Sequence, residues 1–359
     1  MPAHVLQHIF LDEFQHKLYC DSNASCRATA AYLFKPSVIL KDVASWKSVS
    51  HIRDLDFFWH SPCCYDYTSN AKQRGYWGGG TRSKLILHSL RYIVRAKPKV
   101  VGFEQVRNII FKKHKWLIKW MKKILRQKGY LIKSGVLDSS HFGNPQRRKR
   151  FFMIGVRSDV AVAPMKWPKV KRGSTSSETE ALLDPQNAAV DLPMRLPPFG
   201  QQNSKEPNRQ RRLVLQALAK LKSQAKASCC EALRAQSGKL STAVKKSMKM
   251  KHQQRYKRMA HRLVVDIGCS MSRATFSASG VPVITATRAA GRDYWVLGRG
   301  RRISLAELFR CQGLLYTSDD VSRLPASPTQ IGMMVGNSIP FQVLDALTRG
   351  ALVAAGYKV

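Results

Sequence analysis

The chain has 359 residues, of which 44% are hydrophobic, and this is enough to bury a substantial core. Its 61 Lys and Arg residues outnumber its 22 Asp and Glu residues and give a formal net charge of +39. Such a charge favours a polyanionic partner, foremost nucleic acid. No apolar run reaches the roughly 18 residues of a membrane-spanning helix, which argues against a membrane partner.

The eight cysteines show no Cys-x-x-Cys spacing, which argues against a zinc site and against a disulfide scaffold. We therefore expect no metal, and reduced thiols in an intracellular compartment. The first residues lack the charged and apolar regions of an export signal.

Up to about residue 158, short apolar runs alternate with longer helical patterns, which is typical of α/β units around a buried parallel sheet. The strands predicted in this part are Lys17–Cys20, Val38–Leu40, Asp56–Trp59, Val100–Phe103 and Phe151–Val156. Between the last two, apolar residues at helical spacing predict a helix over Asn108–Lys128, with Gly129 at its C-terminal cap. The lysines of this helix form the opposite face, which we interpret as solvated, with direct DNA contact as the second interpretation.

From about residue 163 to 207 the composition shifts to Pro, Ser, Asn and Gln, which indicates a loop or linker. The segment Lys205–Arg262 carries 17 basic residues and only two acidic ones. We interpret it as a basic insertion that contacts phosphates, with disorder as the alternative. Further strands are predicted at Leu263–Ile267, Val281–Thr285 and Tyr294–Leu297.

A nucleophile and a carboxyl follow two of the predicted strands. Pro62 and Cys63 come after the apolar run Phe57–Trp59, at the carboxyl end of a strand, where α/β sheets place active sites. A thiol held there by a rigid proline is a candidate nucleophile, although most such cysteines are small buried hydrophobes. Glu104 ends the strand Val100–Phe103 and therefore brings a carboxyl within reach of the same pocket.

Two further elements complete the pattern. The run Asn144–Arg150 precedes the last of the early strands, and alternation along a strand can point Arg148 and Arg150 to one face. Gly336–Pro340 is a turn before a helical pattern from Phe341 to Ala355. Taken alone, a basic run is a solvated edge and a Gly-Asn turn is a helix cap.

In this order, the four elements resemble Pro-Cys-Gln, Glu-Asn-Val, Gln-x-Arg-x-Arg and Gly-Asn-Ser, motifs of the cytosine-C5 DNA methyltransferase family. Arg302–Gly313 resembles the family's Arg-x-Leu-Thr-x-x-Glu-x-x-Arg-x-Gln-Gly stretch, and Pro282–Thr285 its Pro-x-x-Thr. The resemblance covers nearly the whole chain except the basic insertion. It implies an α/β fold, with a Rossmann-like S-adenosylmethionine-dependent methyltransferase sheet and a smaller, basic target-recognition domain.

The resemblance implies methyl transfer from S-adenosylmethionine to C5 of cytosine, with Cys63 adding to C6 of the base. Glu104 would hold the base and supply a proton, Arg148 would contact the base carbonyl, and Arg150 and Gln146 would support the loop. The target nucleotide would be flipped out of double-stranded DNA. The residues that the resemblance assigns to the cofactor site are Asp21, Asp42, Pro62, Leu85, Asn337 and Ser338.

The sequence departs from the family pattern at three places. Cys64 stands where the family has Gln or Asn, and Gln105 where it has Asn. Nothing before Cys20 matches the Phe-x-Gly-x-Gly turn that cradles the methionine end of the cofactor, and Val264–Ser270, a displaced alternative, lacks the second glycine. We therefore expect weak cofactor binding unless a partner or a missing segment supplies the N-terminal strand.

We expect three parts: residues 1–162 as the catalytic domain, 163–300 as the basic target-recognition region with its linker, and 301–359 as the segment that completes the catalytic domain. One alternative is a catalytically inactive nucleic-acid-binding homologue that has lost cofactor binding. The other is an RNA cytosine-C5 methyltransferase, whose Cys-Phe-Thr signature is absent from the sequence. The expected location is the nucleus of a eukaryote, or the cytoplasm or nucleoid of a prokaryote.

Overall fold

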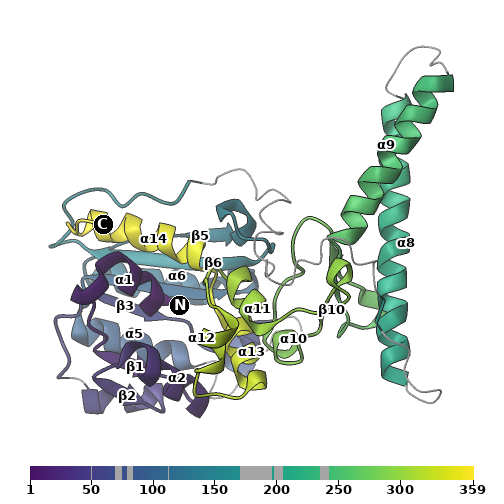
Figure 1. Cartoon of the computed structure of the whole chain (residues 1–359). Coiled ribbons are helices and arrows are strands. Elements are labelled where there is room, and N and C mark those ends of the chain that lie inside the picture. The colour runs from purple at the N-terminus through teal and green to yellow at the C-terminus, as the bar shows by residue number, and fades with distance from the viewer. Residues whose placement is uncertain are drawn as a thin grey trace.

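A computed structural model describes residues 1–49, 51–68, 75–78, 84–111, 113–169, 196–197, 205–234 and 242–359. In this part of the chain, a body of helices around a sheet adjoins a smaller part, from which a long helical hairpin projects (Figure 1). No helix within these ranges combines the length and the apolar character that crossing a membrane requires.

The larger sheet has four strands in the order β3-β4-β6-β5. Their bounds are β3 Phe57–His60, β4 Val100–Val106, β5 Tyr130–Asp138 and β6 Lys149–Arg157. Strands β3 and β4 are parallel, whereas β6 is antiparallel to both β4 and β5. The sheet is therefore mixed: the predicted parallel pairing is confirmed for β3 and β4 and is wrong for β6. The connection between β5 and β6 is too short for the crossover that parallel neighbours need.

Strand β5 is a structural finding that the sequence pattern did not predict. Its side chains alternate irregularly between buried and exposed, and it contains Gly135. It lies at the edge of the sheet and pairs only with β6 among the described residues. An edge strand with one protected face carries a weaker apolar signal than a central one.

A second sheet pairs β1 (Leu18–Cys20) and β2 (Val38–Leu40) in parallel. Both strands agree with the prediction to within one residue. Leu18 and Val38 pack with Phe58 of β3 and with the buried Tyr92 in one apolar cluster. The two sheets therefore share a layer of side chains although they do not pair with each other in the described part of the chain.

Helices cover both faces of the larger sheet. Helices α1 (Pro2–Phe10) and α14 (Phe341–Ala354) pack on one face, and α5 (Leu85–Ala96) and α6 (Lys115–Gln127) on the other (Figure 1). The short helices α2 (Ala24–Phe34) and α3 (Gly75–Gly78) complete this part.

Helix α6 follows from its amphipathic sequence. Its buried residues recur three or four positions apart: Leu117, Ile118, Met121 and Leu125. The helix starts later than predicted because Arg107–Ile110 first forms a 3-10 turn. Gly129 lies just beyond its C-terminus with φ of 84°, a left-handed conformation that glycine adopts without strain.

The smaller part contains a second four-stranded sheet in the order β10-β9-β7-β8. Its strands are β7 Val264–Asp266, β8 Phe276–Ser277, β9 Tyr294–Val296 and β10 Arg301–Arg302. The strands predicted around β7 and β9 are confirmed, whereas the strand predicted at Val281–Thr285 is wrong. There Val281 makes a single bridge to Gln146, and the Ile284 amide donates to the side chain of Gln146 instead of to a strand.

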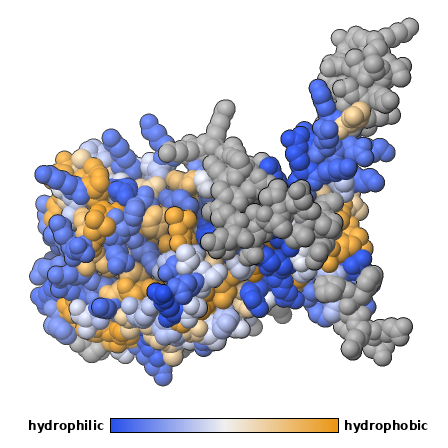
Figure 2. All heavy atoms as spheres, in the orientation of Figure 1, coloured by the Kyte–Doolittle hydropathy of each residue, from blue (hydrophilic) through white to orange (hydrophobic). Residues whose placement is uncertain are grey.

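Two long antiparallel helices, α8 (Lys205–Arg234) and α9 (Thr242–His261), form the projecting hairpin (Figure 1). Its root is apolar, since Leu213 and Leu221 of α8 and Ala260 of α9 are buried against the four-stranded sheet that contains β7 and β9. Farther out the described side chains are mostly hydrophilic and exposed (Figure 2). Both helices lie within the predicted basic insertion Lys205–Arg262, and most of the predicted linker before it lies outside the described residues.

The chain then returns to the body through a series of helices. These are α10 Ala286–Ala290, α11 Leu305–Cys311, α12 Ser318–Ser322, α13 Pro328–Asn337 and finally α14. Side chains of Ser304, Thr317 and Ser327 each form a capping box at a helix start. The buried Glu307 of the first box also accepts two hydrogen bonds from Arg301, at 2.8 and 2.9 Å.

We expect Gly102→Ala to lower the free energy of unfolding by about 1–3 kcal/mol, the range for overpacked cores. Gly102 pairs with Trp59 across β3 and β4, and a Cβ there would lie 2.0 Å from Trp59 Cε3. Urea denaturation followed by circular dichroism measures the change. In a Trp59→Leu background the same substitution should cost less, and an equal loss in both backgrounds would show that the indole is not the cause.

Candidate active site

The turn after β3 carries two adjacent cysteines, Cys63 and Cys64. Pro62, just before them, is buried, and its carbonyl accepts a hydrogen bond from Gln105 Nε2 at 3.1 Å. Gln105 is itself fully buried on β4, so this bond ties the turn to the neighbouring strand. A 3-10 turn, Tyr65–Tyr67, follows and ends in a buried ring. The chain is therefore anchored on both sides of the two thiols.

Glu104 lies on β4, one residue beyond the position that pairs with the end of β3. Its carboxyl is 12% exposed and lies 3.3 Å from Arg150 Nε, and the Ser61 side chain hydrogen-bonds to it. Burial raises the pKa of Glu104, while the charges of Arg150 and Arg148 and the Ser61 bond oppose that rise. Glu104 therefore keeps its proton to a higher pH than a carboxyl in water, as a general acid requires.

Arg150 is the second residue of β6, and Arg148 directly precedes the strand. In the ladder Arg150 pairs with Val106, two residues along β4 from Glu104. Arg148 is 5% exposed, and its Nη1 donates to the Ile284 carbonyl at 2.5 Å. Burial, together with the charge of Arg150, lowers the pKa of Arg148 to about 9. The side chain stays cationic at neutral pH, so two positive charges act on one carboxyl.

The two thiols differ in their surroundings. Cys63 is exposed, whereas Cys64 is partly buried. Burial and Glu104 raise the pKa of Cys64, while Arg150 and Arg148 lower it. These interactions group Cys64 with the carboxyl and the two guanidiniums, and this set of four residues is named the thiol–carboxyl cluster below.

Gln146 is fully buried and joins separate parts of the chain. Its Oε1 accepts from the Ile284 amide at 3.1 Å, and its Nε2 donates to Gln312 Oε1 at 3.0 Å. Asn144, also fully buried, donates to the Cys311 carbonyl at 2.8 Å. The segment before β6 is thus held by residues more than a hundred positions later in the sequence.

Two of the residues assigned to the cofactor follow the strands of the smaller parallel pair. Asp21 comes directly after β1, and Asp42 two residues after β2. Both carboxylates act on the Cys20 thiol and raise its pKa, after burial as the larger cause, which shows that they are neighbours. Each is fixed by its own turn, because Asp21 accepts from the Asn23 amide at 2.8 Å and Asp42 from the Ala44 amide at 2.9 Å.

The other assigned cofactor residues lie at helix ends and in the cysteine turn. Leu85 begins α5, and Asn337 ends α13 with its side chain exposed. Ser338 follows and donates to the Val335 carbonyl at 2.7 Å. Among the described residues, no hydrogen bond joins this set to Glu104 or the arginines. Of the residues assigned to the cofactor site, Pro62 alone also belongs to the cysteine turn, because it directly precedes the two thiols.

Sequence reasoning assigned no contact to Ser61 and treated Gln105 as a minor departure. In the structure Ser61 Oγ accepts from Trp59 Nε1 at 2.9 Å and bonds the Glu104 carboxyl, so it links β3 to the acid. Gln105 holds the proline carbonyl of the cysteine turn. A hydroxyl and an amide at strand ends have no distinctive spacing, so only the pairing of β3 with β4 identifies them.

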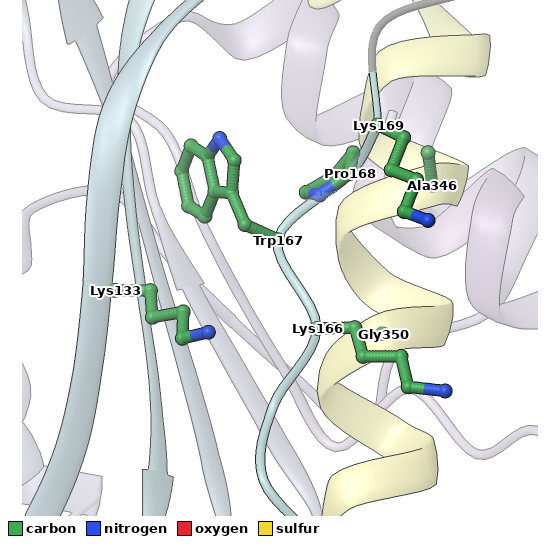
Figure 3. A pocket seen from close by; sticks show the side chains of 7 residues that line it. All are labelled: Lys133, Lys166, Trp167, Pro168, Lys169, Ala346 and Gly350. Carbon is green, nitrogen blue, oxygen red and sulfur yellow. The ribbon is translucent and has the colours of Figure 1, made fainter.

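Within the described ranges, no group of three or more His, Cys, Asp or Glu side chains is arranged to hold a metal ion. A shallow hollow of about 640 Å³ lies between β5 and α14 and is lined by Lys133, Lys166, Trp167, Pro168, Lys169, Ala346 and Gly350 (Figure 3). Because β5 is at the opposite edge of the sheet from β3, this hollow is separate from the thiol–carboxyl cluster.

The same fold occurs in solved methyltransferase structures. The chain matches S. pombe Dnmt2 methyltransferase with a TM-score of 0.55 at 13% identity, over 99% of this chain and 96% of that one. It matches Entamoeba histolytica methyltransferase EhMeth with a TM-score of 0.55 at 14% identity, over 94% and 89%. The predicted α/β methyltransferase fold is thereby confirmed.

Residues 7–351 match the family model of C-5 cytosine-specific DNA methylase. The chain belongs to this family, whose members use S-adenosylmethionine. It is similar to Type II methyltransferase M.Bsp6I of Bacillus sp., at 30% identity over 35% of this chain and 39% of that protein. It is also similar to Type II methyltransferase M.HhaI of Haemophilus parahaemolyticus, of which it covers 32%. The chain thus aligns with well under two thirds of the length of both relatives.

We expect Glu104→Gln to remove a pH dependence of stability. Since folding raises the pKa of Glu104, the folded chain holds this proton more tightly than the unfolded chain. This contribution is fully present below the unfolded pKa, about 4.3, and is lost as the pH rises through the folded value. The variant should therefore gain unfolding free energy relative to the parent as the pH increases.

Urea denaturation of both proteins over this pH range measures the effect, with Glu13→Gln at an exposed position as the control. A difference between Glu104→Gln and the parent that is the same at every pH would contradict the assignment.

Proposed function

We propose that this chain transfers a methyl group to C5 of cytosine in DNA, through a covalent adduct between a cysteine sulfur and C6 of the base. The observation that carries the proposal is the thiol–carboxyl cluster, in which a partly buried thiol, a buried carboxyl and two guanidiniums interact. Membership of the C-5 cytosine-specific DNA methylase family supports DNA cytosine as the substrate.

The thiol begins the reaction. Addition of the thiolate to C6 makes C5 electron-rich, which a methyl acceptor needs. Cys63 is the thiol that the Pro-Cys motif proposes, and its exposed side chain can reach an incoming base. Its neighbour Cys64 interacts with Glu104 and the two arginines, but burial and Glu104 raise the pKa of Cys64 and so favour its protonated form. We therefore propose Cys63 as the attacking sulfur, directly beside the thiol–carboxyl cluster.

Glu104 and the arginines balance the charge that develops on the ring. As the sulfur bonds C6, the protonated carboxyl of Glu104 donates to N3, and its raised pKa fits this step. Arg148, with Arg150 beside it, binds the base carbonyl, where a buried cation is most effective. After C5 gains the methyl group, its proton passes to solvent, the C5–H electron pair restores the C5–C6 double bond, and the sulfur leaves C6 as a thiolate. The proton on N3 returns to the carboxylate of Glu104, so that both groups regain their starting state.

S-adenosylmethionine, when bound, supplies the methyl group. The carboxylates of Asp21 and Asp42 fit its ribose and adenine end, because both lie in turns after parallel strands and neighbour one thiol. Asp42 is exposed and Asp21 partly so, which leaves acceptor oxygens for hydroxyl and amino groups. We propose that the walls of the same site are formed by Pro62, Leu85, Asn337 and Ser338.

A further strand belongs to the proposal. Among the described residues β1 pairs only with β2, and β3 only with β4, so each has an unpaired edge. All four residues of β3 are only partly buried, whereas those of β4 are mostly buried. A strand from a partner or from another segment would satisfy these edges and complete the floor of the cofactor site.

Double-stranded DNA is the proposed partner, with its target base flipped out. The proposed organisation keeps residues 1–162 and 301–359 for catalysis and residues 163–300 for DNA recognition. The hairpin of α8 and α9 supports this, because its exposed lysines and arginines suit phosphates. The proposed location is wherever such DNA lies, the nucleus of a eukaryote or the cytoplasm or nucleoid of a prokaryote.

We expect S-adenosylmethionine to bind the full chain with a measurable heat in isothermal titration calorimetry. Asp42→Ala should weaken binding about tenfold or more, since a charge-assisted hydrogen bond contributes roughly 1.5–3 kcal/mol. Asp12→Ala, at an exposed position in another turn, is the matched control. No heat at millimolar cofactor would contradict the proposal and favour a catalytically inactive nucleic-acid-binding protein.

We expect Cys63→Ser to abolish the covalent adduct with duplex DNA containing 5-fluorocytosine, in the presence of cofactor. The fluorine blocks loss of the C5 substituent, so the sulfur–C6 bond persists and gel electrophoresis detects it. Cys64→Ser, the adjacent matched variant, should keep much of the adduct, because the raised pKa of this partly buried thiol favours its less reactive protonated form.

The reverse pattern would reject Cys63 and assign the attacking sulfur to Cys64, one position later than the motif indicates. If both variants form the adduct, the thiol mechanism itself is wrong. Parallel reactions with tRNA separate the DNA activity from an RNA activity, because only the preferred nucleic acid should accept methyl groups.

A further inference from the structure

Three tryptophans are exposed on the face of α6 and on the neighbouring α3. Trp77 of α3 is 79% exposed, and Trp116 and Trp120 of α6 are 37% and 36% exposed. The rings of Trp77 and Trp116 stack, with centroids 5.7 Å apart and planes 19° apart. Residues four apart on a helix share a face, so the second α6 indole continues the surface. Grouped exposed indoles mark an interaction surface, because water solvates them poorly.

Tyr76 holds the stacked rings in place. Its ring packs edge-on against Trp77, at 4.9 Å and 87°, and against Trp116, at 5.4 Å and 90°. Tyr76 also packs against the apolar cluster between α6 and the sheet. The pair of indoles is therefore held by a side chain that is rooted in the core.

Positive charge surrounds the tryptophans. Lys115, Lys119 and Lys123 are exposed on α6 and alternate with the indoles along the helix. From residue 105 to residue 137 the chain has ten Lys and Arg residues and neither Asp nor Glu. No carboxylate within this segment neutralises the face, so it favours an anionic ligand.

The aromatic surface adjoins the cysteine turn. Helix α3 contacts the 3-10 turn Tyr65–Tyr67, which begins directly after Cys64. The ring of Tyr67 packs edge-on against His114, the residue that precedes α6, at 5.3 Å and 87°. A nucleic acid bound at the thiol–carboxyl cluster would therefore have this surface beside it.

We propose that Trp77, Trp116 and Trp120 form a stacking platform for unpaired nucleobases of a single-stranded nucleic acid, with the α6 lysines on its phosphates. Stacking on aromatic rings beside basic side chains is how proteins bind single strands without reading their sequence. The bases of a duplex are already stacked inside it and would leave the indole faces unused. The platform goes beyond the proposed methyl transfer and does not depend on it, since binding requires neither cofactor nor thiol.

The test is fluorescence anisotropy with a labelled oligothymidylate of about twelve nucleotides, a length within the usual site sizes for single strands. We expect Trp77→Ala to weaken binding at least about fivefold, the lower end of the effect of losing one stacked base. The affinity of Trp77→Ala for a blunt hairpin duplex should fall by less than about twofold relative to the parent. Trp77→Phe keeps an aromatic face and should bind the oligonucleotide nearly as tightly as the parent does.

Tyr32→Ala is the matched control, because Tyr32 is also exposed, at 50%, but lies on α2. Binding by the double variant Lys119→Gln/Lys123→Gln should depend less on salt. The slope of the logarithm of the binding constant against the logarithm of salt concentration should become shallower by about 0.7 for each lost phosphate contact. An oligouridylate in parallel shows whether RNA or DNA strands are preferred, and preference for either supports the platform.

Unchanged oligonucleotide affinity in Trp77→Ala would overturn the proposal. So would an equal loss for the hairpin duplex, which would assign the surface to duplex phosphates. Analytical sedimentation tests whether the parent associates with itself. If it does, and if Trp77→Ala loses this self-association while its affinity for the oligonucleotide is unchanged, the surface belongs to the contact with a second copy instead.

Discussion

The carboxyl of Glu104 is removed from most of its water and lies next to the guanidinium of Arg150, at 3.3 Å. Burial of an ionised carboxyl is costly unless a partner offsets the lost hydration. Here the partners are cationic groups from β6 and a hydroxyl from the end of β3. The acid, the arginines and the neighbouring thiol are consequently one electrostatic unit, in which the positive charges of the two arginines lower the pKa of both Glu104 and Cys64 against the effect of burial.

That unit depends on contacts between segments far apart in the chain. Arg148 is aimed by its bond to the Ile284 carbonyl, and Gln146 by bonds to the same residue's amide and to Gln312. These side chains are buried, so each lost bond would leave an unsatisfied polar group. The return segment after the hairpin therefore stabilises the segment that leads into β6, although it is over a hundred residues away in sequence.

The positive charge of the chain is divided between surfaces of different character. The hairpin of α8 and α9 is mostly charged and polar, and exposed beyond its apolar root (Figure 2). The face of α6 combines lysines with indoles, and it lies beside the cysteine turn. A surface with charge alone suits any phosphate backbone, whereas one with aromatic rings also suits bases that have left their stack. The interpretation of α6 as a merely solvated helix does not explain its exposed tryptophans.

The sequence by itself determined the family, because each motif is a short local pattern that can be identified without knowing which strands pair. It also located β2 and the helix α14 closely, since their apolar periodicity is strong. It missed β5 and mispredicted an extra strand at Val281–Thr285, because an edge strand and an extended loop differ only in their hydrogen-bond partners. Which of two adjacent thiols joins Glu104, and which hydroxyl and amides hold the site, only the tertiary structure decided. Those relations depend on strand register and burial, which bring distant residues together and which no spacing along the chain encodes.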